Sequence, residues 1–164
     1  MPKRFSQKVI KQLIQDAVKE AIPILRLEHW QIEVHFDNSN EFRATCAAVP
    51  RYQTSVLEFA PKRIRIFECV EFAVHELAHI ITWRTAELLE QWAGDDPEKI
   101  EEAEAAYEFV TTQIGHIAVP RVVEALEALG KIPSEAKDVP NVIVHDKKPI
   151  RKLLNKEPLT NEQK

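Results

Sequence analysis

The sequence predicts an α+β domain in which a small antiparallel sheet packs on helices. A helical pattern at the N-terminus precedes three short segments with strand character, and longer helical patterns follow them without any internal repeat. Apolar residues make up 45% of the 164 residues and charged residues 29%, which is enough apolar side chain for one core. The chain has 3 glycines beside 10 prolines, a ratio that disfavours a turn-rich β-barrel and suits helices separated by prolines.

The first half of the chain supplies one helix and the strands. Apolar residues recur at three- and four-residue spacing over residues 5–22, which predicts an amphipathic helix that ends near Pro23. Residues 30–36, with the sequence WQIEVHF, alternate large apolar and polar side chains and therefore predict a half-buried strand. Two further short strands are predicted at residues 44–49 and 55–59, joined by a turn.

The second half is helical by its apolar spacing. A long helix is predicted over residues 69–92. A second helix begins at Pro97, a favourable first helical position, and runs to about residue 118. Because proline is expected to interrupt a helix, Pro120 is predicted to open a further helix, which ends at Gly130.

Charge divides the chain into two parts. Residues 1–130 carry 14 Lys and Arg and 21 Asp and Glu, a net charge of −7, whereas residues 131–164 carry 8 and 5, a net charge of +3. The second part holds four of the ten prolines and little periodicity, so we expect an extended or disordered basic tail without which the domain of residues 1–130 folds. Its apolar runs, residues 142–144 and 150–154, could contact a protein partner.

The composition also argues against several classes of protein. No apolar run approaches the roughly 20 residues that a membrane span needs. The net charge of −4 makes nucleic acid an unlikely main ligand. Two cysteines do not form a disulfide framework and the N-terminal residues include no apolar leader, so we expect a soluble, cytoplasmic protein.

The residues that indicate chemistry are His75, Glu76 and His79, which form the motif H-E-x-x-H. Histidines four residues apart on a helix project from one face about one turn apart, so both imidazoles can bind a single Zn²⁺. Glu76 then lies beside a metal-bound water as a general base. Leu77 and Ile81 fall on the opposite side of the helix, so we expect a core face separate from the metal-binding face.

A catalytic zinc takes three protein ligands, so a third must come from elsewhere in the chain. No histidine follows at the spacing H-x-x-G-x-x-H, but the next predicted helix carries Glu101, Glu102, Glu104 and Glu108. Glu104 lies nearest the apolar stripe of that helix, Glu108 borders the stripe, and Glu101 is more remote. Glu104 and Glu108 therefore both remain candidates.

These motifs resemble those of the gluzincins, and in particular the minimal metallopeptidases found mainly in phages and prophages. The similar motifs are W-x-I-x-V from Trp30, V-H-E-L-x-H at residues 74–79, T-A-E-L-L-E at residues 85–90 and E-x-V-x-T from Glu108. The resemblance implies a minimal zincin-like domain, a zinc cofactor, a peptide or protein substrate and, for a phage protein, the cytoplasm of a bacterial host. It selects Glu108 as the third ligand and Thr112 as a partner of a ligand histidine, with Glu104 as the alternative ligand.

A site of this composition predicts zinc-dependent hydrolysis of peptide bonds. Glu76 would take a proton from the metal-activated water and deliver it to the leaving amine. Tyr107, Tyr52 and His116 are candidates for stabilising the oxyanion. The alternative is a phage-derived regulatory or interaction module with a zincin fold, in which the zinc is structural or non-catalytic.

Overall fold

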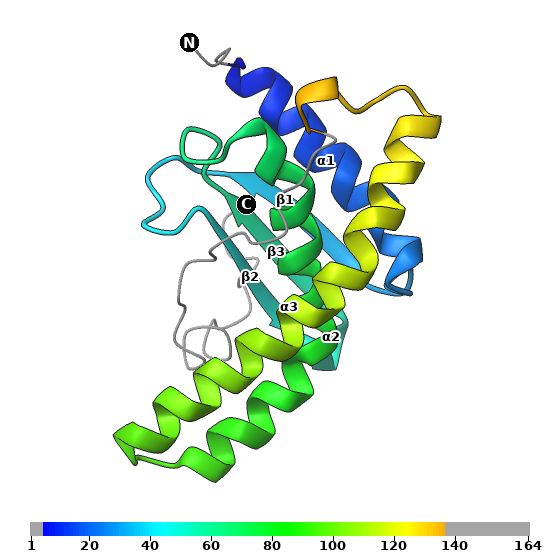
Figure 1. Cartoon of the computed structure of the whole chain (residues 1–164). Coiled ribbons are helices and arrows are strands. Elements are labelled where there is room, and N and C mark those ends of the chain that lie inside the picture. Colours follow the sequence, from blue (N-terminus) through cyan, green and yellow to red (C-terminus); the bar gives the residue numbers. More distant parts are fainter. Residues whose placement is uncertain (1–4, 137–164) are drawn as a thin grey trace, which may run out of the picture.

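The computed structural model describes residues 5–136 and shows an α+β arrangement of three α-helices and a three-stranded sheet (Figure 1). The α-helices are α1 Gln7–Ile24, α2 Cys69–Ala93 and α3 Pro97–Ala128, and the strands are β1 Gln31–Phe36, β2 Ala44–Val49 and β3 Thr54–Phe59. Short 3₁₀ helices occur at η1 Pro50–Tyr52, η2 Ile66–Glu68 and η3 Ser134–Ala136. The predicted order of helix, strands and helices is therefore confirmed.

The sheet is mixed, so the predicted fully antiparallel sheet is wrong. Its strand order is β1-β3-β2, in which β3 pairs antiparallel with β2 and parallel with β1. Residues 37–43 connect β1 to β2, which are not neighbours in the sheet because β3 lies between them. Alternating apolar residues show which side chains share a face of the sheet, but not which strands are neighbours. The strand order therefore could not be predicted from this pattern.

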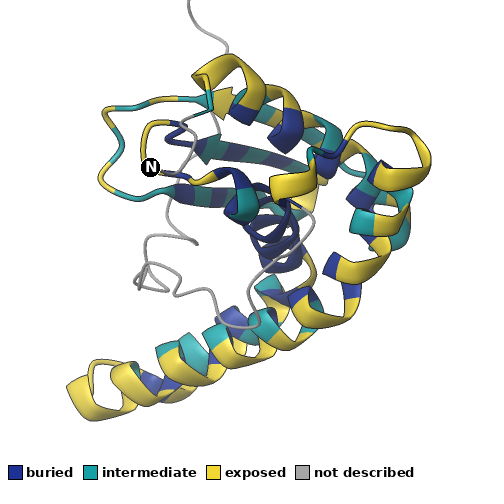
Figure 2. Ribbon diagram, turned by 45° about the horizontal axis from the view of Figure 1, so that its top comes forward, coloured by how far each residue is buried: buried dark blue, intermediate teal, exposed yellow. Residues whose placement is uncertain are grey.

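One face of the sheet carries the core. Cys46 of β2 pairs with Leu57 of β3, and both side chains are buried. Phe59, on the same face of β3, has no exposed surface. The alternate residues of β1, such as Glu33 and His35, are exposed. Buried residues concentrate where the helices meet the sheet (Figure 2), as expected for a two-layer arrangement.

Two prolines lie inside helices: α1 ends within one residue of Pro23, as predicted, but Pro120 does not open a new helix as expected. Pro23 belongs to the last turn of α1, which continues to Ile24. Pro120 lies within α3, so the two helices predicted around it are one continuous helix. A proline removes one hydrogen bond from a helix, but Val122 and Leu126 beyond it are completely buried, and this packing holds the last turns in helical form.

Helices α2 and α3 form an antiparallel hairpin whose connected ends project beyond the sheet (Figure 1). The turn between them contains Gly94, whose φ of +57° favours a residue without a Cβ. The side chain of Asp96 accepts hydrogen bonds from the first backbone N–H groups of α3 and so caps that helix. Small residues such as Ala86 and Ala103 are buried between the two helices, which allows close packing.

The packed part of the chain continues beyond the boundary predicted at residue 130. Lys131 donates a hydrogen bond to Asp16 of α1 over 2.9 Å, and Ile132 and Ala136 belong to the main core. The domain therefore extends at least to Ala136. The apolar runs at residues 142–144 and 150–154 lie outside the described residues.

Among residues 5–136, none of the helices combines the length and the apolar character that crossing a membrane requires.

The burial of Ile132 leads to a test of the revised boundary. Replacing Ile132, which is 9% exposed, by Ala should lower the free energy of unfolding by about 2–3 kcal/mol because it leaves a cavity in the core. The matched control is Leu129→Ala, since Leu129 is 53% exposed and should change stability by less than about 0.5 kcal/mol. Urea unfolding followed by circular dichroism measures both variants. If Ile132→Ala is as stable as Leu129→Ala, the Ile132 side chain does not support the fold.

Candidate metal centre

The N-terminal half of α2 is enclosed on all sides. Every residue from 69 to 80 is buried, and His75, Glu76 and His79 have exposed fractions of 1%, 0% and 2%. We expected Ile81 to belong to a core face opposite the metal-binding face. Ile81 is instead 41% exposed, so this part of the prediction is wrong. Residues 69–80 are all buried, whereas exposed positions recur from Ile81 onward because the connected ends of α2 and α3 project beyond the sheet.

The two histidines converge as their spacing predicts. Their ring centroids are 4.7 Å apart in an edge-to-face arrangement. One ligand atom from each of His75, Glu76 and His79 can be chosen so that all lie within 4.8 Å of one another, close enough for a common metal ion. This group could hold a metal ion, and its position on a rigid, buried helix fixes the donor atoms in place.

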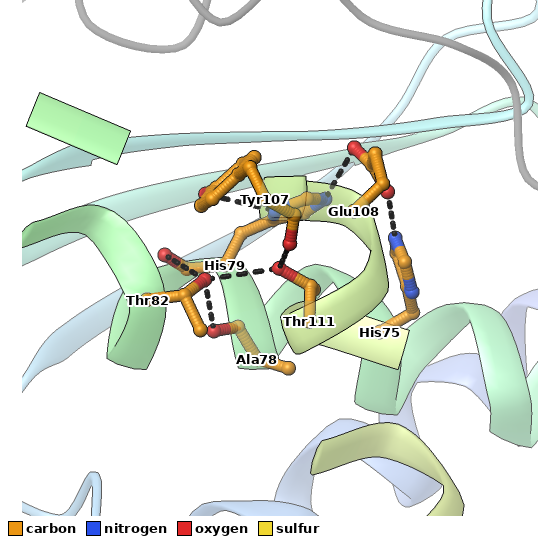
Figure 3. Close-up of polar contacts among 7 residues, drawn as sticks. All are labelled: His75, Ala78, His79, Thr82, Tyr107, Glu108 and Thr111. Atoms are coloured by element: carbon orange, nitrogen blue, oxygen red, sulfur yellow. Dashed lines mark hydrogen bonds and ion pairs between the residues drawn. The ribbon is translucent and has the colours of Figure 1, made fainter. Parts of the chain in front are cut away.

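Glu108 of α3 reaches both imidazoles (Figure 3). Its Oε2 lies 3.2 Å from His75 Nε2 and its Oε1 lies 3.8 Å from His79 Nε2. The side chain is 22% exposed, so this carboxylate forms the partly open side of the group. Glu104 is half-buried and lies one helical turn, about 6 Å along the axis, nearer to the connection with α2.

Tyr107 contacts His79 on the Nδ1 side of its ring. Its hydroxyl lies 2.9 Å from His79 Nδ1, and the two rings stack with centroids 5.2 Å apart. Burial raises the pKa of the Tyr107 hydroxyl, which therefore stays protonated at neutral pH. When Nδ1 carries the imidazole proton and donates it to the tyrosine oxygen, the Nε2 lone pair faces Glu108 and is available to a metal ion.

A pair of threonines joins the two helices next to this contact. Thr82 Oγ1 lies 3.1 Å from Thr111 Oγ1, and both side chains are buried. Thr82 also contacts the carbonyl of Ala78, and Thr111 contacts the carbonyl of Tyr107, each over 3.0 Å. These contacts link the turn that bears His79 to the turn that bears Tyr107 and Glu108 (Figure 3).

The remaining candidates are not among the buried groups of the site. Tyr52 is 60% exposed in η1, and His116 is exposed on α3. Thr112, expected beside a ligand histidine, is half-buried, and it is Thr111 that occupies the interface with α2. The roles of Tyr107 and Thr111 were missed by sequence reasoning, although a tyrosine in the apolar stripe directly before a candidate ligand is a usable signal.

A cavity of about 420 Å³ lies beside the metal centre, between the end of β2 and the C-terminal half of α2. His79 and Tyr107 line one part of it, and Trp83 contributes another part of its wall. The buried histidines are therefore next to a space that could admit part of another molecule.

The donor set suits a transition-metal ion. Two imidazoles and a carboxylate are the ligand types found in zinc sites of the catalytic kind, and they also accept other divalent first-row metals. The residues present therefore fit a metal ion without fixing its identity.

No family model matches this chain, and no curated protein or solved structure shows significant similarity to it. Any functional interpretation of the site consequently depends on its own residues and geometry.

The contact between Tyr107 and His79 predicts a role in metal affinity. The Tyr107→Phe variant loses the hydrogen bond to Nδ1 but keeps the stacked ring, so Zn²⁺ affinity should fall by about 10- to 100-fold. Tyr52→Phe, at a tyrosine that is 60% exposed, is the matched control and should leave the affinity unchanged. Competition with a chromophoric chelator measures both; an unchanged affinity for Tyr107→Phe would exclude a role for this hydrogen bond in metal binding.

The choice between the two glutamates is tested in the same way. The wild-type protein should bind about one Zn²⁺, and Glu108→Ala should weaken binding by more than the roughly 100-fold that loss of an outer-sphere contact can cause. Glu104→Ala, one turn away on the same helix, is the matched control and should weaken binding much less. A larger loss at Glu104, or a protein free of metal when purified without chelators, would contradict this assignment.

Proposed function

We propose that this protein is a zinc-dependent metallopeptidase of the gluzincin type. The observation that carries the proposal is that Glu108, from a helix distant in sequence, lies against both histidines of the H-E-x-x-H motif. An isolated motif of this kind can occur by chance on a helix. A partly buried carboxylate that lies against both histidines is much harder to explain as chance.

His75, His79 and Glu108 would hold the zinc ion. Three protein ligands are characteristic of catalytic zinc sites, in which the fourth position takes water or substrate. When bound, the ion lowers the pKa of that water and polarises the substrate carbonyl. Tyr107 keeps the His79 ring oriented through Nδ1, so that its other nitrogen stays directed toward the metal position.

Glu76 is the proposed general base and acid. It follows the ligand His75 directly in the sequence and its side chain is completely buried. Its carboxylate takes a proton from the attacking water as the new C–O bond to the peptide carbonyl forms. The same carboxyl group then gives this proton to the amide nitrogen as the C–N bond breaks, which yields a carboxylic acid and an amine.

The sheet offers a way to hold an extended peptide near the site. β2 is an edge strand, and its C-terminal residues Ala48 and Val49 line the cavity beside His79. A peptide that pairs with this edge would run alongside the metal centre, with its main chain held by backbone hydrogen bonds. Backbone pairing of this kind accepts peptides of many sequences, so the selection of particular substrate side chains requires a separate feature.

A second candidate function is a regulatory or interaction module with a structural metal. The observation that favours it is the deep burial of His75, Glu76 and His79, which resembles a closed site more than an open one. In that case the metal would join α2 to α3 and stabilise the fold, and no bond would be cleaved.

A substitution at Glu76 separates the two functions. Glu76→Gln should retain zinc, because the ligands are unchanged, but lose peptide hydrolysis by about 100-fold or more. Glu102→Gln, at an exposed position of α3, is the control and should retain full activity. The assay is cleavage of a proteome-derived peptide library, with zinc content measured in parallel. Hydrolysis that persists in Glu76→Gln would refute the role of this residue, and a zinc-loaded wild type without any hydrolysis would favour the structural site.

A further inference from the structure

The hairpin of α2 and α3 carries most of the large apolar side chains that the described residues expose. Nine such side chains are exposed among residues 5–136, and six of them belong to these two helices (Figure 2). They are Ile81, Leu88 and Trp92 of α2 and Phe109, Val110 and Ile117 of α3. Single exposed apolar residues are ordinary, but apolar residues gathered on one surface usually indicate a place where another molecule binds.

On α3 the exposed residues form one stripe along the helix. At 100° per residue, six exposed positions of α3 fall within about 100° of one another around the helix axis. They are Glu102, Ala106, Val110, Gln113, Ile117 and Arg121, and we call this set the α3 stripe. Glu108 lies about half a turn around the helix from the centre of the α3 stripe, so the stripe is separate from the candidate metal centre.

The α3 stripe is complementary to itself in the antiparallel direction. Its residues follow one another at spacings of four, four, three, four and four, a series that is the same from either end. When two copies of α3 pack antiparallel in this register, each stripe residue faces a different stripe residue of the second copy. The facing pairs are Glu102 with Arg121, Ala106 with Ile117 and Val110 with Gln113, each formed twice. Opposite charges therefore meet at both ends, and mainly apolar side chains meet between them.

Exposed residues of α2 widen this surface. Lys99 precedes Glu102 by about one turn of α3, in line with the α3 stripe, and its Nζ lies 5.7 Å from the centre of the Trp92 ring. Trp92 therefore lies on the same side of the hairpin as the stripe, and it is 52% exposed. Leu88, one turn earlier on α2, is 54% exposed. The apolar surface thus includes residues of both helices.

We propose that the protein forms a symmetric homodimer in which the α3 stripes of two copies pack antiparallel. Burial of Val110 and Ile117 supplies the driving force, and the two contacts of Glu102 with Arg121 fix the antiparallel register. A partner of different sequence would not require charges that alternate in sign between the two ends of one stripe, so self-complementarity favours a second copy. The interface closes on itself and leaves the metal centre uncovered, because Glu108 faces the other side of α3.

The oligomeric state of the full-length chain tests the proposal. Sedimentation velocity over the micromolar range of protein concentration should show a reversible change from the mass of one chain to twice that mass. A protein that stays monomeric throughout this range would overturn the proposal. Another segment of the same chain that covers the stripe would give that result.

Charge reversal on the α3 stripe tests the register. Glu102→Arg brings two arginines together and Arg121→Glu brings two glutamates together, so each should raise the dissociation constant of the dimer by about 10-fold or more. An equimolar mixture of the two variants should restore dimers, because every facing pair of charges is then opposite again. Glu101→Arg, exposed on α3 but outside the stripe, is the matched control and should leave dimerisation unchanged.

These variants distinguish antiparallel pairing of the stripes from other modes of association. Dimers that persist unchanged in both single variants would form through another surface and would overturn the proposal. A mixture of the two variants that stays monomeric would overturn the antiparallel register and the proposal with it. Because all three substituted positions are exposed, thermal unfolding followed by circular dichroism should show that each variant folds as the wild type does.

Discussion

The candidate site depends on the contact between α2 and α3. The H-E-x-x-H motif brings together His75 and His79, but a further carboxylate comes from Glu108, on the next helix. The turn at Gly94 returns the chain antiparallel to α2, and the buried alanines between the helices allow the approach. The threonine pair then fixes the register of one helix on the other, so that the donors meet.

Burying the imidazoles and carboxylates of the candidate site lowers the stability of the fold, and folding alone does not require these groups to be buried. Taking imidazoles and carboxylates out of water is unfavourable unless other groups compensate. The structure compensates with specific contacts, as between His79 and Tyr107 and between His75 and Glu108. An apolar set of the same volume would stabilise the same packing at least as well. Folding alone therefore does not require this arrangement, and the buried group could hold a metal ion.

The sequence predicted the elements and the motif but not how they meet. Apolar spacing identified the helices and strands because it reflects the face that each element buries. The direction of β1 relative to β3 and the continuity of α3 through Pro120 depend on tertiary packing, which leaves no local pattern. Helical phase alone slightly favoured Glu104, because Glu104 lies nearer than Glu108 to the apolar stripe of that helix. The histidines meet α3 at the border of that stripe, where Glu108 lies.

The gradient of burial along α2 places the enclosed H-E-x-x-H motif next to a cavity. Residues 69–80 are enclosed, whereas from Ile81 onward exposed and buried positions alternate as the hairpin leaves the sheet. His79 is the last residue of the motif and also lines the cavity, so the metal centre lies at the transition between these two environments. The enclosed half of the helix fixes the side chains of the motif, and the projecting half forms one wall of the cavity. One continuous helix therefore carries both the enclosed motif and one wall of the neighbouring cavity, with His79 at the boundary between them.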